Sequence, residues 1–132
     1  MDLNLMPERS VHMELKQVMQ QQSFVIVGDT LNETKFAYKI KHAMANRGYD
    51  VQCVGKELES INDAEGEIDI VDLCIHPVKG LELLKSCEKP FKSVVLQPGA
   101  GSDEIRAYLT EQQIPFIDGC LLVGLASFPR EV

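Results

Sequence analysis

Apolar residues occur along this chain in short continuous runs that alternate with amphipathic stretches. Each run is too short for a buried helix, and each ends at a turn residue or a polar loop. Runs that are apolar on both sides indicate strands of a parallel sheet covered by helices on both faces. Five strands are therefore predicted, at residues 24–27, 51–54, 68–75, 94–96 and 116–117.

The stretches between the runs carry apolar residues at helical spacing. Helices are predicted from Phe36 to Gly48, around Leu81 and Leu84, and after Ser102 as an N-cap. A further helix over residues 10–22, capped by Ser10, precedes the first strand. Strands alternating with helices predict right-handed βαβ units. The expected fold is α/β, a doubly wound parallel five-stranded sheet in the order 3-2-1-4-5, with an N-terminal helix.

Length and composition change this picture little. A chain of 132 residues suits one domain over residues 1–132, with residues 1–9 as a loose arm. The net charge of −7 argues against nucleic acid as a partner. No apolar run approaches the roughly 20 residues of a membrane span, and no secretion signal is recognisable, so we expect a cytoplasmic protein with reduced cysteines.

The candidate chemistry lies where the first strand ends. Ligands of doubly wound sheets bind at the carboxyl ends of strands, where the strand order reverses. Gly28 permits a sharp turn, the amides of the following helix can hold a phosphate, and Lys35 adds positive charge. Asn32 is suited to capping that helix or contacting the ligand. Asp29 brings negative charge, and only the first glycine of the Gly-x-Gly-x-x-Gly fingerprint is present.

The ends of the next strands refine the choice of ligand. Lys56 follows the second strand, where NAD enzymes usually carry a carboxylate. A lysine suits the additional ribose phosphate of coenzyme A or of NADP, although a solvated surface lysine is the simpler interpretation. His76 follows the third strand, but nothing at a suitable spacing completes a catalytic set with it. We therefore predict no catalytic residue and no metal site.

Taken in order, these segments resemble a known family. The matching features are Phe24-Val25-Ile26-Val27-Gly28, the helix start at residues 35–40, Gly48-Tyr49-Asp50-Val51, Ile68-Asp69-Ile70-Val71-Asp72, Pro77, Gln97-Pro98-Gly99 and Cys120. From about residue 23 to residue 120 the chain is similar to the small stand-alone CoA-binding domains, which are related to the CoA-binding domain of the succinyl-CoA synthetase α subunit. The resemblance implies a Rossmann-like fold, coenzyme A as the ligand class and no established catalytic activity.

The resemblance also implies site residues by position. Those for the pyrophosphate are Gly28, Asp29, Thr30, Asn32 and Lys35. Val54, Gly55 and Lys56 would border the adenosine. Ile75, His76, Pro77, Gln97 and Gly99 would border the remainder of the cofactor. Where the family commonly has Gly-Ala-Ser after the first strand and Asn-Pro after the second, this chain has Gly28-Asp29-Thr30 and Gly55-Lys56.

Three functions are consistent with these residues. The leading one is a non-catalytic sensor or carrier that binds coenzyme A or a CoA thioester at the C-terminal edge of the sheet. The others are an NADP-type dinucleotide-binding protein with a redox or regulatory role, and an interaction module with a decayed nucleotide site. A binding role is favoured over an enzyme because 132 residues leave no room for a separate substrate domain.

Assembly is a separate question. Residues 120–125 are too apolar for a free tail and either pack on the domain's own sheet or bury against a second copy. The N-terminal helix adds a second apolar surface without an obvious partner in the chain, which favours a homodimer.

Overall fold

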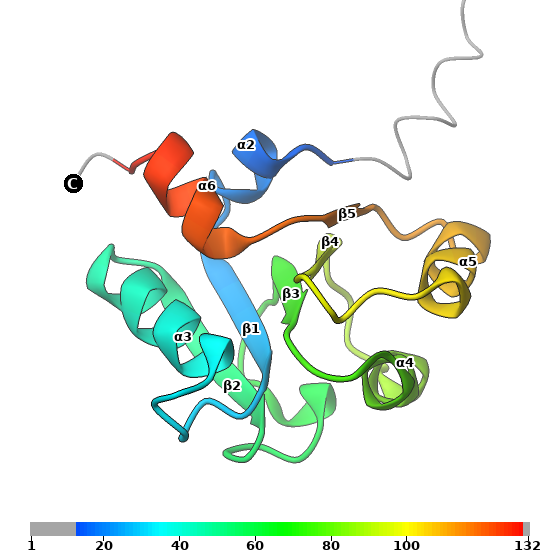
Figure 1. The fold of residues 1–132 in the computed structure, drawn as a ribbon. Coiled ribbons are helices and arrows are strands. Elements are labelled where there is room, and N and C mark those ends of the chain that lie inside the picture. The colour runs from blue at the N-terminus through cyan, green and yellow to red at the C-terminus, as the bar shows by residue number, and fades with distance from the viewer. Residues whose placement is uncertain (1–12, 131–132) are drawn as a thin grey trace, which may run out of the picture.

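Five parallel strands form one sheet with helices on both of its faces (Figure 1). The computed structural model describes residues 13–130. The strands are β1 (Ser23–Gly28), β2 (Asp50–Gly55), β3 (Ile70–Leu73), β4 (Ser93–Leu96) and β5 (Phe116–Asp118). The helices are α2 (Leu15–Val18), α3 (Phe36–Asn46), α4 (Pro77–Ser86), α5 (Asp103–Glu111) and α6 (Leu121–Ser127), with one 3-10 turn at Ile61–Asp63. The predicted α/β Rossmann-like parallel sheet is confirmed.

The order of the strands differs from the prediction. The sheet runs β2-β1-β3-β4-β5, so the expected order 3-2-1-4-5 is wrong. All four residues of β3 are buried, which suits a strand with neighbours on both sides. By contrast, β2 carries the exposed Asp50 and the half-buried Gln52, as an edge strand can. The reversal of order therefore lies between β1 and β3, and their ends define the expected ligand edge.

Local capping signals act as the sequence indicated. The Ser102 hydroxyl accepts a hydrogen bond from the Ile105 amide at 3.2 Å and begins α5. At the other end of the chain, α2 is capped by Glu14, while Ser10 and Val11 of the predicted first helix lie outside the described residues. None of the helices in residues 13–130 is long and apolar enough to cross a membrane.

The two faces of the sheet bury separate cores. The 3-10 turn, α4 and α5 cover one face, while α3, α6 and α2 cover the other. On this second face, Leu121 and Leu125 of α6 are buried together with Val18 and Met19. The helices approach so closely that a Cβ on Gly124 would lie 2.5 Å from the Met19 sulfur.

This packing answers one question about the C-terminal segment. Because α6 and α2 cover each other, the expectation that the N-terminal helix lacks a partner within the chain is wrong, and Leu121 and Leu125 pack within the domain. Self-association remains a prediction that this packing no longer supports.

Candidate functional site

A cleft of about 620 Å³ opens at the C-terminal edge of the sheet, beside the ends of β1 and β2. It brings together six of the residues predicted for the site: Gly28, Asp29, Lys35, Gly55, Lys56 and Ile75. Glu59, Lys79 and Leu83 also line it and were missed by the sequence analysis. Lys79 could have been found, because α4 begins at Pro77 and its first turn stays at the strand ends.

The cleft carries more positive than negative charge although the protein is acidic. Lys35, Lys56 and Lys79 line it with two carboxylates, those of Asp29 and Glu59. Three ammonium groups from three separate segments are a suitable arrangement for a ligand with several phosphates. The local charge therefore runs against the overall charge of −7.

The loop after β1 is held by its own side chains. The Asp29 carboxylate accepts hydrogen bonds from the amides of Leu31 and Asn32, both at 3.2 Å. The Asn32 side-chain oxygen accepts from the Thr34 amide at 3.0 Å and from the Thr34 hydroxyl at 2.7 Å. The loop amides are thus partly occupied by the protein itself. The sequence left open where the Asp29 carboxylate points, and it points back into the loop.

The first turn of α3, unlike the loop before it, is not capped by a side chain. Its N-cap is Lys35, whose side chain makes no capping hydrogen bond. The helix follows β1 directly, so its first amides face the same edge of the sheet as the cleft. Lys35 therefore supplies both the helix start and one of the three cleft cations.

A hydrogen-bond network around the buried Thr30 hydroxyl fixes the loop to the rest of the domain. Thr30 is fully buried, and its hydroxyl donates to the Glu57 carboxylate at 2.6 Å. Lys41 of α3 pairs with the same carboxylate at 2.8 Å. Thr30 was predicted to serve the ligand, but its hydroxyl is engaged with Glu57. Hydrogen bonds from Lys41 and Thr30 lower the pKa of Glu57.

Replacing Glu57 with alanine is expected to destabilise the fold by about 1–3 kcal/mol at pH 7, because the buried Thr30 hydroxyl loses its acceptor. A lowered pKa means that this contribution is present above the unfolded value, about 4.3, and is lost as pH falls through the folded pKa. Urea titrations at pH 7 and at pH 3 should therefore differ less for the variant than for the wild type. Glu59→Ala, an exposed neighbour, is the matched control, and equal loss in both variants would contradict the assignment.

The glycines at the strand ends keep the backbones in close contact. A Cβ on Gly28 would lie 2.5 Å from the Cys74 carbonyl oxygen and 3.1 Å from the Ala37 Cβ. A Cβ on Gly55, which has φ +127°, would lie 2.7 Å from the Gly28 carbonyl oxygen. These two glycines serve the fold at the cleft floor as well as any ligand.

Several other predicted residues position helices. The His76 Nδ1 accepts a hydrogen bond from the Val78 amide at 3.2 Å and so caps α4, with Pro77 as its first residue. Gln97 is 3% exposed, and its side-chain oxygen accepts from the Leu121 amide at 2.9 Å. Val54 is fully buried in β2, and Gly99 takes φ +89° in the turn after β4. None of these five predicted residues, His76, Pro77, Gln97, Val54 and Gly99, is among those that line the cleft.

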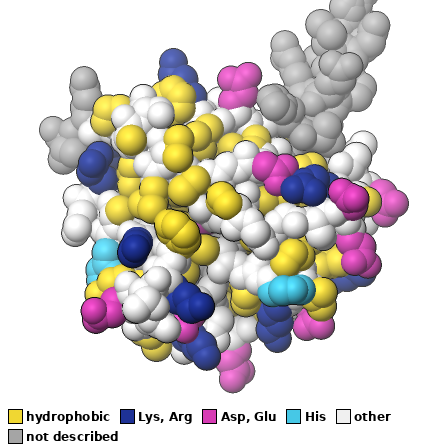
Figure 2. Space-filling model, in the orientation of Figure 1, with side chains coloured by type: hydrophobic (Ala, Val, Ile, Leu, Met, Phe, Trp, Pro, Cys, Tyr) yellow, Lys and Arg dark blue, Asp and Glu magenta, His cyan; other side chains and the backbone are white. Residues whose placement is uncertain are grey.

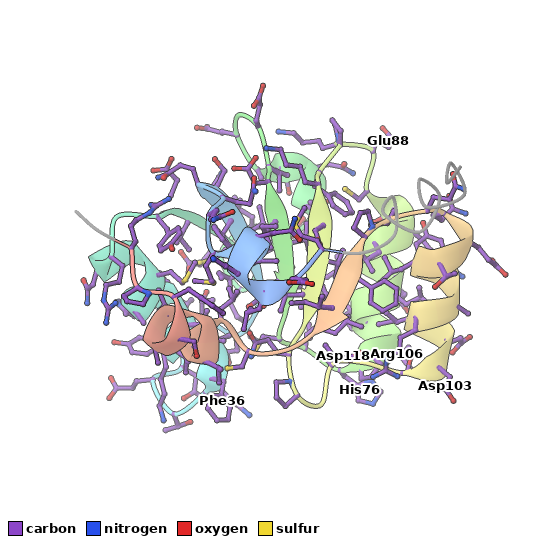
Figure 3. The ribbon with its side chains drawn as sticks, turned by 90° about the horizontal axis from the view of Figure 1, so that it is seen from above. Phe36, His76, Glu88, Asp103, Arg106 and Asp118 are labelled. Carbon is purple, nitrogen blue, oxygen red and sulfur yellow. The ribbon has the colours of Figure 1, made fainter. Side chains whose placement is uncertain are left out.

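The strand-end thiols are poor nucleophiles. Burial raises the pKa of both Cys53 and Cys74 to about 11, so neither thiol ionises near neutral pH. Beyond them along the edge, Arg106 makes two hydrogen bonds to Asp118, at 2.7 and 3.0 Å (Figure 3). Its guanidinium is therefore already paired. Of the cleft lysines, Lys79 forms a loose, exposed ion pair with Glu82 at 3.8 Å.

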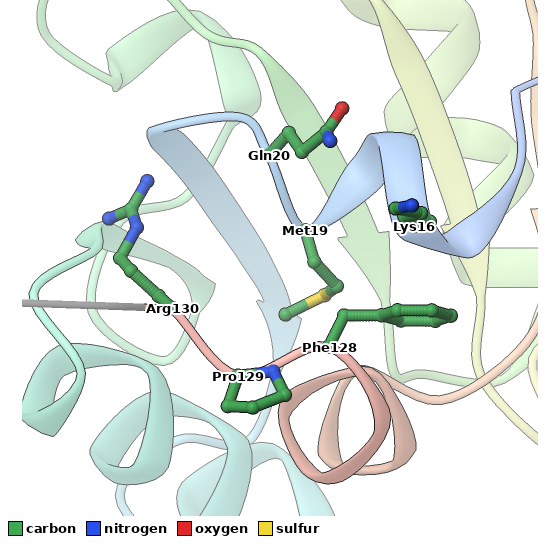
Figure 4. A pocket seen from close by; sticks show the side chains of 6 residues that line it. All are labelled: Lys16, Met19, Gln20, Phe128, Pro129 and Arg130. Atoms are coloured by element: carbon green, nitrogen blue, oxygen red, sulfur yellow. The ribbon is translucent and has the colours of Figure 1, made fainter.

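A second cavity, of about 340 Å³, lies between α2 and the C-terminal residues (Figure 4). Met19, Phe128 and Arg130 are among the residues that line it. The Arg130 guanidinium donates to the Gln21 carbonyl at 3.1 Å and stacks over the Tyr49 ring, 3.9 Å from its centroid. Because Gln21 and Tyr49 precede β1 and β2, the cavity lies at the N-terminal ends of the strands, opposite the cleft. The contacts of Arg130 hold the C-terminal segment against this end of the domain.

Solved structures of similar fold include proteins from Pyrococcus and Thermus species. A hypothetical protein from Pyrococcus horikoshii OT3 superposes with a TM-score of 0.74 at 17% identity, over 86% of this chain and 89% of that one. A protein from Thermus thermophilus gives 0.72 at 21% identity, over 88% and 99%. A conserved hypothetical protein from Pyrococcus furiosus gives 0.68 at 23% identity, over 78% and 98%. At these identities the likeness shows the fold alone.

The family assignment rests on the sequence match. Among curated proteins, none matches the chain. The family model described as a CoA binding domain, in contrast, matches residues 22–126. This range contains the whole sheet, all of the cleft-lining residues and the start of α6. The protein therefore belongs to the family of CoA-binding domains.

Proposed function

We propose that the protein binds coenzyme A or a CoA thioester in the cleft at the C-terminal edge of the sheet. The observation that carries the proposal is the group of three lysines, Lys35, Lys56 and Lys79, in the cleft of an acidic member of this family. Coenzyme A carries a pyrophosphate and a 3′-phosphate, and ammonium groups bind such oxygens with charge-assisted hydrogen bonds.

The lysines divide this task by position. Lys35 lies at the start of α3, where the helix N-terminus adds favourable potential for the pyrophosphate. Lys56 follows β2, the position expected for the adenosine ribose, and Lys79 comes from α4 on the other side of the cleft. Lys56 and Lys79 are therefore our candidates for the 3′-phosphate.

The proposed role is that of a non-catalytic sensor or carrier in the cytoplasm. His76, the candidate acid–base residue, uses its Nδ1 to cap α4. The thiols of Cys53 and Cys74 stay protonated near neutral pH. Both observations favour binding over chemistry.

Coenzyme A is expected to bind more tightly than dephospho-CoA, by roughly 10- to 150-fold, because one charge-assisted contact contributes about 1.5–3 kcal/mol. Calorimetric titration of the purified protein with both ligands, and with NADP and NAD as competitors, measures this directly. In the double variant Lys56→Gln/Lys79→Gln the difference should disappear.

Lys85→Gln is the matched control. Lys85 lies near the end of α4, over the Tyr108 ring, and does not line the cleft. This variant should keep the full preference for coenzyme A. Equal affinities of the wild type for coenzyme A and dephospho-CoA would contradict the assignment of the 3′-phosphate to Lys56 and Lys79. Tighter binding of NADP than of coenzyme A would mean that NADP is the ligand.

A further inference from the structure

Besides Val78 (60% exposed) in the first turn of α4, three large apolar side chains at the C-terminal edge are exposed. They are Leu31 (59% exposed), Phe36 (63%) and Val123 (54%), here called the apolar rim. Leu31 and Phe36 belong to the segment between β1 and α3 that also supplies Asp29 and Lys35 to the cleft. The rim and the cleft therefore share one piece of chain.

The topology brings the third member to the same place. Both α3 and α6 begin directly after parallel strands, so the helix starts lie at the same edge of the sheet. The two helices also pack against each other. Figure 3 places Phe36 on the α6 side of the loop, and Figure 2 shows hydrophobic side chains gathered over this corner with Lys and Arg side chains next to them.

The rim is not part of the core. Leu121 and Leu125 make the buried face of α6, and Ala37, Ile40 and Met44 that of α3. Packing on the sheet thus involves neither Phe36 nor Val123, and both side chains stay exposed among the described residues, with the Lys39 ammonium 5.6 Å from the centre of the Phe36 ring.

We propose that the rim receives the acyl chain of a CoA thioester, so that the ligand of this protein is an apolar acyl-CoA rather than free coenzyme A. The inference rests on the proposed function, because the cleft must hold the phosphates for the chain to reach the rim. The two surfaces match the two chemical parts of such a molecule: ammonium groups face the phosphates, and apolar side chains cover the hydrocarbon. Free coenzyme A would leave the rim in water.

The test compares coenzyme A, acetyl-CoA and octanoyl-CoA by calorimetry on the full chain, at ligand concentrations below micelle formation. Burial of one methylene favours binding about fourfold, so covering two or three methylenes predicts octanoyl-CoA roughly 15- to 60-fold tighter than coenzyme A. Acetyl-CoA should bind about as well as coenzyme A. Sodium octanoate without the nucleotide should not reach the same affinity.

Substitutions in the rim test where the acyl chain of the ligand binds. Phe36→Ser and Val123→Ser should each reduce the advantage of octanoyl-CoA at least threefold while leaving the affinity for coenzyme A unchanged. Phe128→Ser makes the same kind of change at the other end of α6, in the second cavity, and should keep the full advantage. Circular dichroism and urea titration of each variant verify that it is folded.

The outcomes separate the two proposals. Binding of coenzyme A with equal affinity for octanoyl-CoA would overturn the acyl assignment and leave the proposed function standing. Absence of binding for every CoA ligand would overturn the proposed function itself. If both rim variants still bind octanoyl-CoA more tightly than coenzyme A by the full factor, the acyl chain binds elsewhere and the inference is overturned. A dimer of the wild type in light scattering that becomes monomeric in Phe36→Ser or Val123→Ser would assign the rim to a second copy of the protein and overturn the inference.

Discussion

Replacing Asp72 with valine is expected to stabilise the protein by about 1–3 kcal/mol at pH 7, the usual cost of a buried polar group without a hydrogen-bond partner. Asp72 lies in the middle of β3, in register with Ile26 of β1 and Val95 of β4, and it is fully buried. Neither of its carboxylate oxygens has a hydrogen-bond partner among the described residues. Valine has a similar size and suits a central strand.

The pH dependence of this stabilisation follows from the protonation of Asp72. Burial raises the pKa of Asp72 well above its ordinary value. The folded state therefore keeps a proton that the unfolded chain releases above about pH 3.9. Stability falls by about 1.4 kcal/mol for each pH unit above this value, until the pH passes the folded pKa. The wild type therefore loses stability relative to the variant as the pH rises from this value towards the folded pKa of Asp72.

Urea titrations of wild type and Asp72→Val between pH 4 and pH 8 measure this effect. The wild type should lose stability with rising pH relative to the variant, and the two curves should diverge most near neutral pH. A variant no more stable than the wild type at pH 7 would mean that the folded protein stabilises the Asp72 carboxylate in solution.

Asp69→Val is the matched control, with the opposite sign. Its carboxylate accepts hydrogen bonds from the amides of Ser23, at 2.9 Å, and Gln22, at 3.0 Å, and pairs with Lys92 at 3.2 Å. Burial raises the pKa of Asp69, but the two amides and Lys92 together lower it further, so the net pKa is below its ordinary value. Asp69→Val should therefore be destabilising at pH 7.

Gly28→Val is expected to destabilise the fold by about 3 kcal/mol or more, besides any effect on the ligand. The Cβ would lie 2.5 Å from the Cys74 carbonyl oxygen, where the Cys74 amide also donates to the Val27 carbonyl at 2.8 Å. Because the obstruction is backbone rather than a flexible side chain, β1 and β3 must separate to admit the substitution. Loss of ligand binding in this variant would therefore not by itself locate the ligand.

Chemical denaturation of Gly28→Ala and Gly28→Val measures the cost. Gly99→Ala is the control, because a Cβ there meets nothing within 4 Å and only φ +89° opposes it. That conformation costs about 1–2 kcal/mol. A Gly28→Val protein as stable as Gly99→Ala would show that the strand ends can relax, and its affinity for coenzyme A would then report on the site itself.

The sequence by itself determined the five strands, the helices α3, α4 and α5, and the edge of the sheet at which the cleft opens, but not the helix α6. Continuous apolar runs ending in glycine or polar residues predicted all five strands, and Ser102 marked the start of α5, because these signals act within a few residues. The ends of parallel strands gather at one edge in any such sheet, so Gly28, Lys35 and Lys56 could be assigned together before their neighbours were known.

Only the tertiary structure decided the strand order and the hydrogen-bond partners of the individual side chains. The position of β3 beside β1 depends on how the completed sheet buries both of its faces. The hydrogen bond between Thr30 and Glu57 joins residues that are 27 positions apart in the sequence. Asp72 is a buried acid without a hydrogen-bond partner among the described residues because β1 and β4 lie on either side of it. Each of these depends on contacts between distant segments, whose energies no local pattern of residues encodes.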